Sequence, residues 1–156
     1  MSNLMETGNL ITPSYRIIVA DRHTLFRETL KRVLSEVSEL VVVGEAGDSS
    51  SLLDLLHRLN LDQQVPQLVI LDISMPVLRG IETTRQIKEV FPDVKVLILS
   101  MAREKECLDC VLGVGAEGYL LKQNANTELF SAVEKIKQGG IYVSPGMAGK
   151  FEDILR

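Results

Sequence analysis

Short runs of apolar residues alternate along the chain with longer stretches in which apolar positions recur every three or four residues. The short runs predict strands buried on both faces, because a strand with one solvated face alternates apolar and polar residues. The longer stretches predict amphipathic helices. The predicted strands are Arg16–Ala20, Leu40–Val43, Leu68–Leu71, Val94–Leu99 and Tyr119–Leu121.

A helical pattern follows each predicted strand. Asp48 and the three serines after it are residues that commonly cap helix N-termini, so a helix is expected to begin there. Pro92 ends the third helix, and the pair Gly139-Gly140 ends the last one. The apolar positions of the five helices lie within Leu25–Val37, Leu52–Leu59, Ile81–Phe91, Glu104–Val114 and Leu129–Ile136.

Five such units predict an α/β fold, in which helices cover both faces of a parallel sheet. Connections between parallel strands are right-handed, so the leading solution is a doubly wound, five-stranded (βα)5 sheet. Ligands bind such sheets at the carboxyl ends of the strands. Polar residues stand at these ends in the sequence: Asp21 after the first strand, Asp72 after the third, Ser100 after the fourth and Lys122 after the fifth.

These four residue types are suited to phosphoryl transfer. A carboxylate such as Asp72 can attack a phosphoryl donor and become an acyl phosphate. The transferred group carries negative charge on three oxygens, which the ammonium of Lys122 and the hydroxyl of Ser100 can stabilise. Asp21 is a second carboxylate, suited to holding Mg²⁺. His23 is interpreted as a residue at the start of a helix rather than as a proton carrier.

Residues 15–140 resemble the receiver domain of two-component response regulators, and within that family the NarL/LuxR branch. The resemblance is carried by segments in matching order and spacing: IIVADRHTLFRE, LVVVGEAGD, LVILDISMPVLRGIE, VLILSM, GAEGYLLK and GGIYVSP. It implies a flavodoxin/CheY-like fold. It also implies that Asp72 is the phosphoacceptor, Ser100 the switch hydroxyl, Tyr119 the switch aromatic and Lys122 the phosphate-binding lysine, with Asp21, Asp72 and the backbone carbonyl of Ser74 at a Mg²⁺ ion.

Arg22 departs from the family pattern, which places a second acid here that binds Mg²⁺ directly. An arginine is permanently charged and offers no lone pair to a metal. Arg22 either swings into the place of the metal and neutralises Asp21 and Asp72, or points to solvent and leaves a weakened Mg²⁺ site. We therefore expect phosphorylation that is impaired, slow or unconventional.

Composition narrows the class of protein. The net charge of −4 and the pI of about 5.2 argue against a basic nucleic-acid-binding surface. No apolar run approaches the ~20 residues that span a bilayer, and the N-terminus lacks the features of a signal peptide. Two cysteines without an export signal favour a reduced, cytoplasmic protein, not a disulfide scaffold.

The expected organisation is a flexible leader over residues 1–14, a receiver domain over 15–140, and over 141–156 the start of a linker to an output domain that is absent from the chain. The resemblance implies a sensor histidine kinase as partner, a homodimer, and contact with DNA only through the output domain. It implies no enzyme and no membrane.

Two other readings stay open. The first is a pseudo-receiver, a phosphorylation-independent interaction module in which Arg22 locks one conformation. The second is a phosphatase that uses Asp72 as nucleophile. Such an enzyme needs a general acid beside the nucleophile, and Ser74 cannot serve as one.

Overall fold

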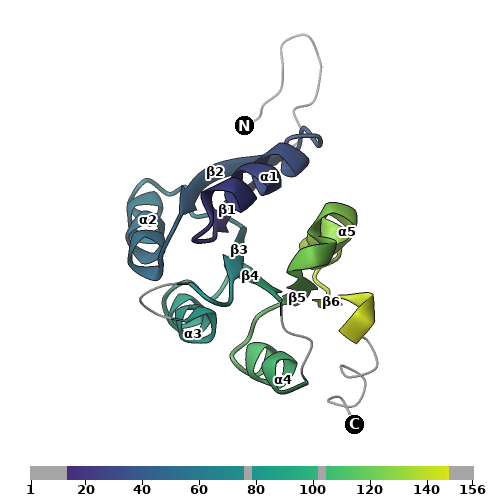
Figure 1. Ribbon diagram of the computed structural model, residues 1–156. Helices are drawn as coiled ribbons and strands as arrows, with labels where there is room; N and C mark the ends of the chain where they lie inside the picture. The colour runs from purple at the N-terminus through teal and green to yellow at the C-terminus, as the bar shows by residue number, and fades with distance from the viewer. Residues whose placement is uncertain (1–13, 76–78, 102–104, 148–156) are drawn as a thin grey trace.

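The computed structural model describes residues 14–75, 79–101 and 105–147. All but the last residue of the expected leader, and the expected linker from residue 148 onward, lie outside the described residues. The chain forms one twisted parallel sheet flanked by helices (Figure 1). The α/β class and the doubly wound arrangement predicted from the sequence are confirmed.

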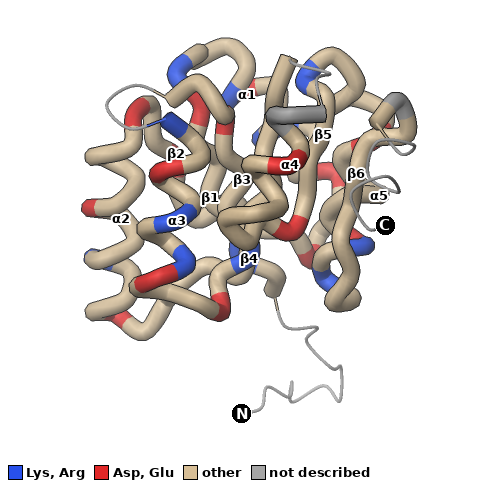
Figure 2. The backbone as a smooth tube through the Cα atoms, turned by 90° about the horizontal axis from the view of Figure 1, so that it is seen from below, with Lys and Arg blue, Asp and Glu red and all other residues tan. Residues whose placement is uncertain are grey.

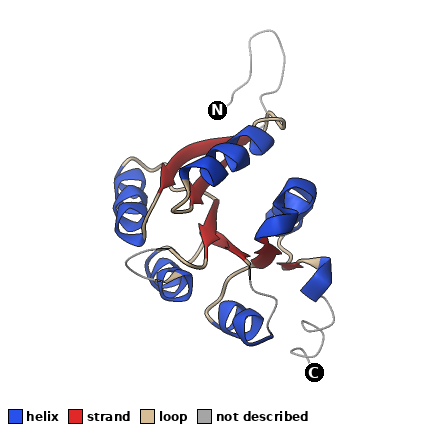
Figure 3. Ribbon diagram, in the orientation of Figure 1, coloured by secondary structure: helices blue, strands red, loops and turns tan. Residues whose placement is uncertain are grey.

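The sheet has six parallel strands in the order β2-β1-β3-β4-β5-β6 (Figure 3). The chain winds outward from β1 in both directions, so the strand order reverses between β1 and β3. The carboxyl edge at this reversal is where doubly wound proteins bind their ligands. The strands are β1 (Tyr15–Ala20), β2 (Leu40–Ala46), β3 (Leu68–Asp72), β4 (Lys95–Ser100), β5 (Gly118–Leu121) and β6 (Tyr142–Val143).

Two separate apolar cores hold the helices on the two faces of the sheet. Side chains alternate along β1, so Ile17 and Val19 pack with α1 and α5, whereas Ile18 and Ala20 pack with α2, α3 and α4.

None of the described helices is long and apolar enough to cross a membrane. The helices are α1 (Thr24–Leu34), α2 (Ser49–Leu61), α3 (Gly80–Val90), α4 (Lys105–Gly113) and α5 (Ala125–Lys137).

Local sequence explains where two of these helices begin. The Asp48 carboxylate accepts a hydrogen bond from the backbone N–H of Ser51 at 2.8 Å, which caps α2 as predicted. Gly80 begins α3 close to the end of β3, where a Cβ would lie 2.6 Å from the Ile73 Cα. Only glycine fits this approach of the start of α3 to the backbone of Ile73.

The sixth strand corrects the predicted count of five. Residues Tyr142–Val143 pair in parallel with β5, and the Ser144 N–H donates to the Tyr119 carbonyl at 2.9 Å. Met147 is fully buried in the core on the side of α2, α3 and α4. The segment expected to begin a linker therefore lies against the sheet at its start. Its two-residue strand is too short to give a periodic signal in the sequence.

Lys and Arg residues are interspersed with Asp and Glu along the chain (Figure 2). Glu45 on β2, for example, pairs with Arg27 and Lys31 on α1. This mixture agrees with the net charge of −4, which argued against a basic nucleic-acid-binding surface.

Candidate functional site

Asp21 and Asp72 stand at the same level of the carboxyl edge of the sheet. β1 pairs with β3 so that Ala20 is opposite Leu71, and each aspartate is the next residue. The Asp21 N–H donates to the Ala46 carbonyl at 3.0 Å, which continues the pairing with β2. Asp21 is fully buried and Asp72 is 2% exposed. Two buried carboxylates require a positive charge nearby, because burial removes the water that would solvate them.

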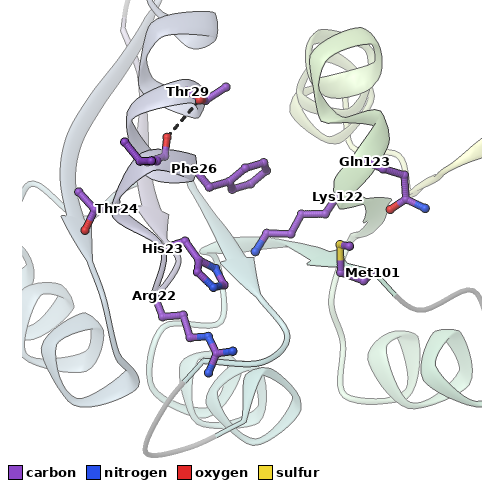
Figure 4. A pocket seen from close by; sticks show the side chains of 9 residues that line it. Arg22, His23, Thr24, Phe26, Thr29, Met101, Lys122 and Gln123 are labelled. Carbon is purple, nitrogen blue, oxygen red and sulfur yellow. Dashed lines mark hydrogen bonds between the residues drawn. The ribbon is translucent and has the colours of Figure 1, made fainter.

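Lys122 supplies that positive charge. It follows β5 and begins the short helix η1 (Lys122–Asn124). Its Nζ lies 2.7 Å from Asp21 Oδ2 and 3.5 Å from Asp72 Oδ2, and the same atom is 4.7 Å from the centre of the Phe26 ring. Figure 4 shows the lysine side chain extended from η1 toward His23 and α1. The structure thus brings three of the predicted site residues together.

Ser74 contacts Asp72 through its amide and its hydroxyl. The backbone N–H donates to Asp72 Oδ1 at 3.1 Å, and the hydroxyl lies 3.1 Å from both carboxylate oxygens. These donors stabilise the charged form of the carboxylate and fix its orientation. The resemblance implied a role for the backbone carbonyl of Ser74, and it gave no sign of these two donors.

Ser100 and Tyr119 lie on the neighbouring strands. Asp72 pairs with Leu99, so Ser100 is one residue further along β4, at the same edge as the carboxylates, and it is buried. Tyr119 lies within β5 and is fully buried in the core shared with α2, α3 and α4. Ser100 is therefore at the site, whereas the tyrosine lies further inside the molecule.

Arg22 is exposed, and no described residue forms an ion pair with it. Its side chain extends away from Lys122 (Figure 4). Of the two arrangements considered, the structure has the one in which Arg22 does not neutralise Asp21 and Asp72. The single ammonium of Lys122 forms ion pairs with both carboxylates instead.

His23 is part of the site, which the sequence analysis did not predict. It occupies the N-cap position of α1 in an extended backbone conformation, as expected for a residue at the start of a helix. This conformation turns its N–H back to Asp21 Oδ1 at 2.8 Å, and its Nδ1 lies 3.2 Å from the same oxygen. Asp21, His23 and Asp72 each offer one ligand atom, and the three atoms lie within 4.8 Å of one another.

This donor set does not match what Mg²⁺ prefers. Mg²⁺ takes oxygen ligands in near-octahedral geometry. Here an imidazole nitrogen accompanies the two carboxylates, and Arg22 cannot act as a ligand. The residues can hold a divalent cation, but they are not the all-oxygen set expected for Mg²⁺.

An open cleft of about 850 Å³ borders Lys122 between the start of α1 and η1. Its lining includes Leu25 and Met101, whose exposed fractions of 82% and 70% are high for apolar residues. Figure 4 shows Phe26 and Lys122 facing each other across it. The cleft is lined by residues that follow β1, β4 and β5, among them His23 and Lys122, whereas Asp21 and Asp72 are buried beside it and do not line it.

Comparisons with known proteins agree with this geometry. The profile of the response regulator receiver domain matches residues 17–134. The transcriptional regulatory protein DegU of Brevibacillus brevis is 38% identical over 130 residues, which are 83% of this chain and 53% of that protein. The chain thus spans about half the length of this relative.

Two solved structures share the whole fold. The crystal structure of a LuxR-family two-component response regulator from Aurantimonas sp. SI85-9A1 is 28% identical, with a TM-score of 0.82 over 92% of this chain and 99% of that chain. The isolated receiver domain of RcsB from Salmonella enterica serovar Typhimurium, solved with the phosphomimetic BeF₃⁻, is 28% identical, with a TM-score of 0.78 over 88% and 98%. The chain belongs to the response regulator receiver domain family, and it is a receiver domain of the NarL/LuxR type.

Proposed function

We propose that Asp72 accepts a phosphoryl group from the phosphohistidine of a sensor kinase, and that this modification sets the state of a LuxR-type transcription regulator. The observation that supports it is the buried Asp72 carboxylate at the carboxyl edge of the sheet, held by Ser74 and 3.5 Å from the Lys122 ammonium. Receiver domains are generally signalling modules and not enzymes.

The step transfers one phosphoryl group. A carboxylate oxygen of Asp72 attacks phosphorus, an O–P bond forms, and the N–P bond of the kinase histidine breaks. The released imidazole nitrogen takes up a proton, and Asp72 becomes an acyl phosphate. Lys122 and the Ser100 hydroxyl stabilise the negative charge on the transferred oxygens.

Phosphorylation replaces the single negative charge of the Asp72 carboxylate by about two charges on the acyl phosphate, at a buried edge of the sheet. We propose that Ser100 and Tyr119 respond to this charge, and that β5 and its neighbouring helices α4 and α5 move with them. The surface formed by these elements, or by α1 and α5, then pairs with a second copy. RcsB has been solved as two dimers bound to two parallel DNAs. For this chain, contact with DNA is proposed only through an output domain outside the 156 residues.

Arg22 is proposed to slow phosphorylation with Mg²⁺, because it replaces an anionic ligand by a cation near the metal site. Arg22→Asp is expected to raise the rate of Mg²⁺-dependent labelling from a small acyl phosphate. The charge-matched control is Arg58→Asp, an exposed position in the last turn of α2, at the opposite edge of the sheet. Rapid labelling of the parent, unimproved by Arg22→Asp, would show that Arg22 does not limit the reaction.

The test of the proposed function is the site of labelling. Intact-protein mass spectrometry after incubation with a small acyl phosphate should show one added phosphoryl group, which Asp72→Asn abolishes. Asp54→Asn, which removes an exposed carboxylate on α2, should label like the parent. Absence of labelling in the parent and in Arg22→Asp would instead support the phosphorylation-independent module. That reading relied on a lock by Arg22, and the exposed arginine provides none.

A further inference from the structure

We propose that Asp21, His23 and Asp72 bind a first-row transition cation, such as Co²⁺ or Zn²⁺, in preference to Mg²⁺. The inference deepens the proposed function, because it names the ion of the same site. Only the role of the ion in phosphorylation depends on the proposed function. Binding of the ion does not require phosphorylation of Asp72.

The first support is the placement of the three donors. Metal–ligand distances near 2.1 Å put two ligand atoms on one ion roughly 3–4 Å apart. The candidate atoms already lie within 4.8 Å of one another. Asp21 and Asp72 are fixed by their strands, whereas the His23 side chain is 56% exposed and free to turn the remaining distance. With its proton on Nε2, a neutral imidazole presents the Nδ1 lone pair to the ion.

The second support is the state of the Asp21 carboxylate. Its Oδ2 atom is buried and receives no hydrogen bond from the described residues. The Lys122 ammonium lies 2.7 Å away and forms an ion pair with it. A buried carboxylate oxygen without a hydrogen bond is costly, and a coordinated cation would satisfy it.

The Lys122 side chain can take another position when a metal ion binds. Its ammonium already lies 4.7 Å from the centre of the Phe26 ring, where the π face stabilises a positive charge. The open cleft beside it is lined by both residues, so the side chain can move away from Asp21 without entering the core. The ion and the lysine therefore need not share the same position.

The preference over Mg²⁺ follows from donor chemistry. Imidazole nitrogen is an ordinary ligand of Co²⁺ and Zn²⁺, whereas Mg²⁺ takes oxygen and gives up its water reluctantly. Arg22 lowers the affinity for any dication by its charge. The imidazole of His23 offsets that loss only for ions that bind nitrogen.

The test is titration of the tag-free protein with Co²⁺ and with Mg²⁺ by calorimetry, together with the visible spectrum of bound Co²⁺. Cys107→Ser and Cys110→Ser are included in every variant, because thiolates also bind Co²⁺. We expect Co²⁺ to bind at least about tenfold more tightly than Mg²⁺, and His23→Ala to remove at least about tenfold of the Co²⁺ affinity while leaving the Mg²⁺ affinity unchanged.

His57→Ala is the matched control, because His57 is the only other histidine of the sequence and lies on α2, with its ring 5.3 Å from that of Phe91. Its Co²⁺ affinity should equal that of the parent. The His23 side chain makes no capping hydrogen bond to α1, so His23→Ala is expected to fold, which far-UV circular dichroism checks. Equal affinity for Co²⁺ and Mg²⁺, or unchanged Co²⁺ binding in His23→Ala, overturns the inference.

Failure of this inference and failure of the proposed function are separable. Phosphoryl labelling of Asp72 without a preference for Co²⁺ would overturn the metal assignment alone. Tight, His23-dependent Co²⁺ binding without labelling would uphold the metal assignment and contradict the proposed function.

Discussion

The charge balance of the site depends on the ammonium group of Lys122, which lies within 3.5 Å of two buried carboxylates. Lys122→Ala leaves both carboxylates without a paired cation. Breaking a buried ion pair in this way costs about 3–5 kcal/mol, so the free energy of unfolding should fall by that amount. Urea unfolding measures it. The control Lys137→Ala, which removes an exposed lysine of α5, should change the value far less. A similar small change in both variants would contradict the assigned role of Lys122.

Tyr15 predicts how stability responds to alkali. Burial, and secondarily the charge of Glu117, raises the pKa of Tyr15 from 10.0 to about 12. Below pH 10 the phenol is neutral in both states, and its effect on stability is fully favourable. Between about pH 10 and 12 the unfolded chain ionises first, so the free energy of unfolding falls as pH rises.

Tyr15→Phe should flatten this alkaline loss, as followed by urea unfolding at several pH values across the same interval. Some slope should remain, because burial and the hydrogen bond to Glu128 also raise the pKa of Tyr142. Parallel profiles for the parent and Tyr15→Phe would show that Tyr15 does not cause the loss.

At the scale of residues, the sequence identified those side chains whose place follows from a strand end. Asp21, Asp72 and Lys122 each come directly at or after an apolar run, and the parallel sheet brings such ends to one edge. The place of His23 in the site could not be predicted. It depends on an extended backbone conformation in which the His23 N–H donates to Asp21. The direction of Arg22 was equally undetermined, since an exposed side chain has no packing pattern to reveal it.

At the scale of elements, β6 is attached to the sheet through the buried hydroxyl of Ser144. The Leu121 N–H donates to Ser144 Oγ at 2.8 Å, and this hydroxyl donates to Glu128 Oε1 at 2.9 Å. Ser144→Ala leaves a buried donor and a carboxylate oxygen short of a partner, which should cost about 1–3 kcal/mol.

Chemical denaturation and hydrogen exchange of the Leu121 amide measure this effect. Ser131→Ala, at an exposed position of α5, is the control and should leave both readouts unchanged. Full protection of the Leu121 amide in Ser144→Ala would contradict the attachment of β6 through this hydroxyl.

The elements that the sequence predicted are those with long or wholly apolar patterns. All five predicted strands and all five predicted helices are present. β2 continues to Ala46, three residues beyond its predicted end at Val43, because Gly44 and Glu45 interrupt the apolar run that defined the strand. β6 was not predicted from the sequence, because pairing with β5, and not its own composition, makes it a strand.

At the scale of the whole molecule, the proposed switch predicts a change in assembly. Arg22→Asp with beryllofluoride, which mimics the phosphoryl group on Asp72, should raise the fraction of dimer in analytical ultracentrifugation. When Asp72→Asn is added to Arg22→Asp, the dimer fraction with beryllofluoride should equal the fraction without it. Equal dimer fractions with and without beryllofluoride would contradict a link between this site and dimerisation.

The parallel sheet places the candidate site at the carboxyl ends of its strands and leaves two outer strands, β2 and β6, at its sides. Because β6 consists of two residues, it offers almost no free ladder of backbone groups to another chain. Growth of the sheet into larger aggregates is therefore blocked on the β6 side, and β2, with seven residues, is the edge from which such growth would start.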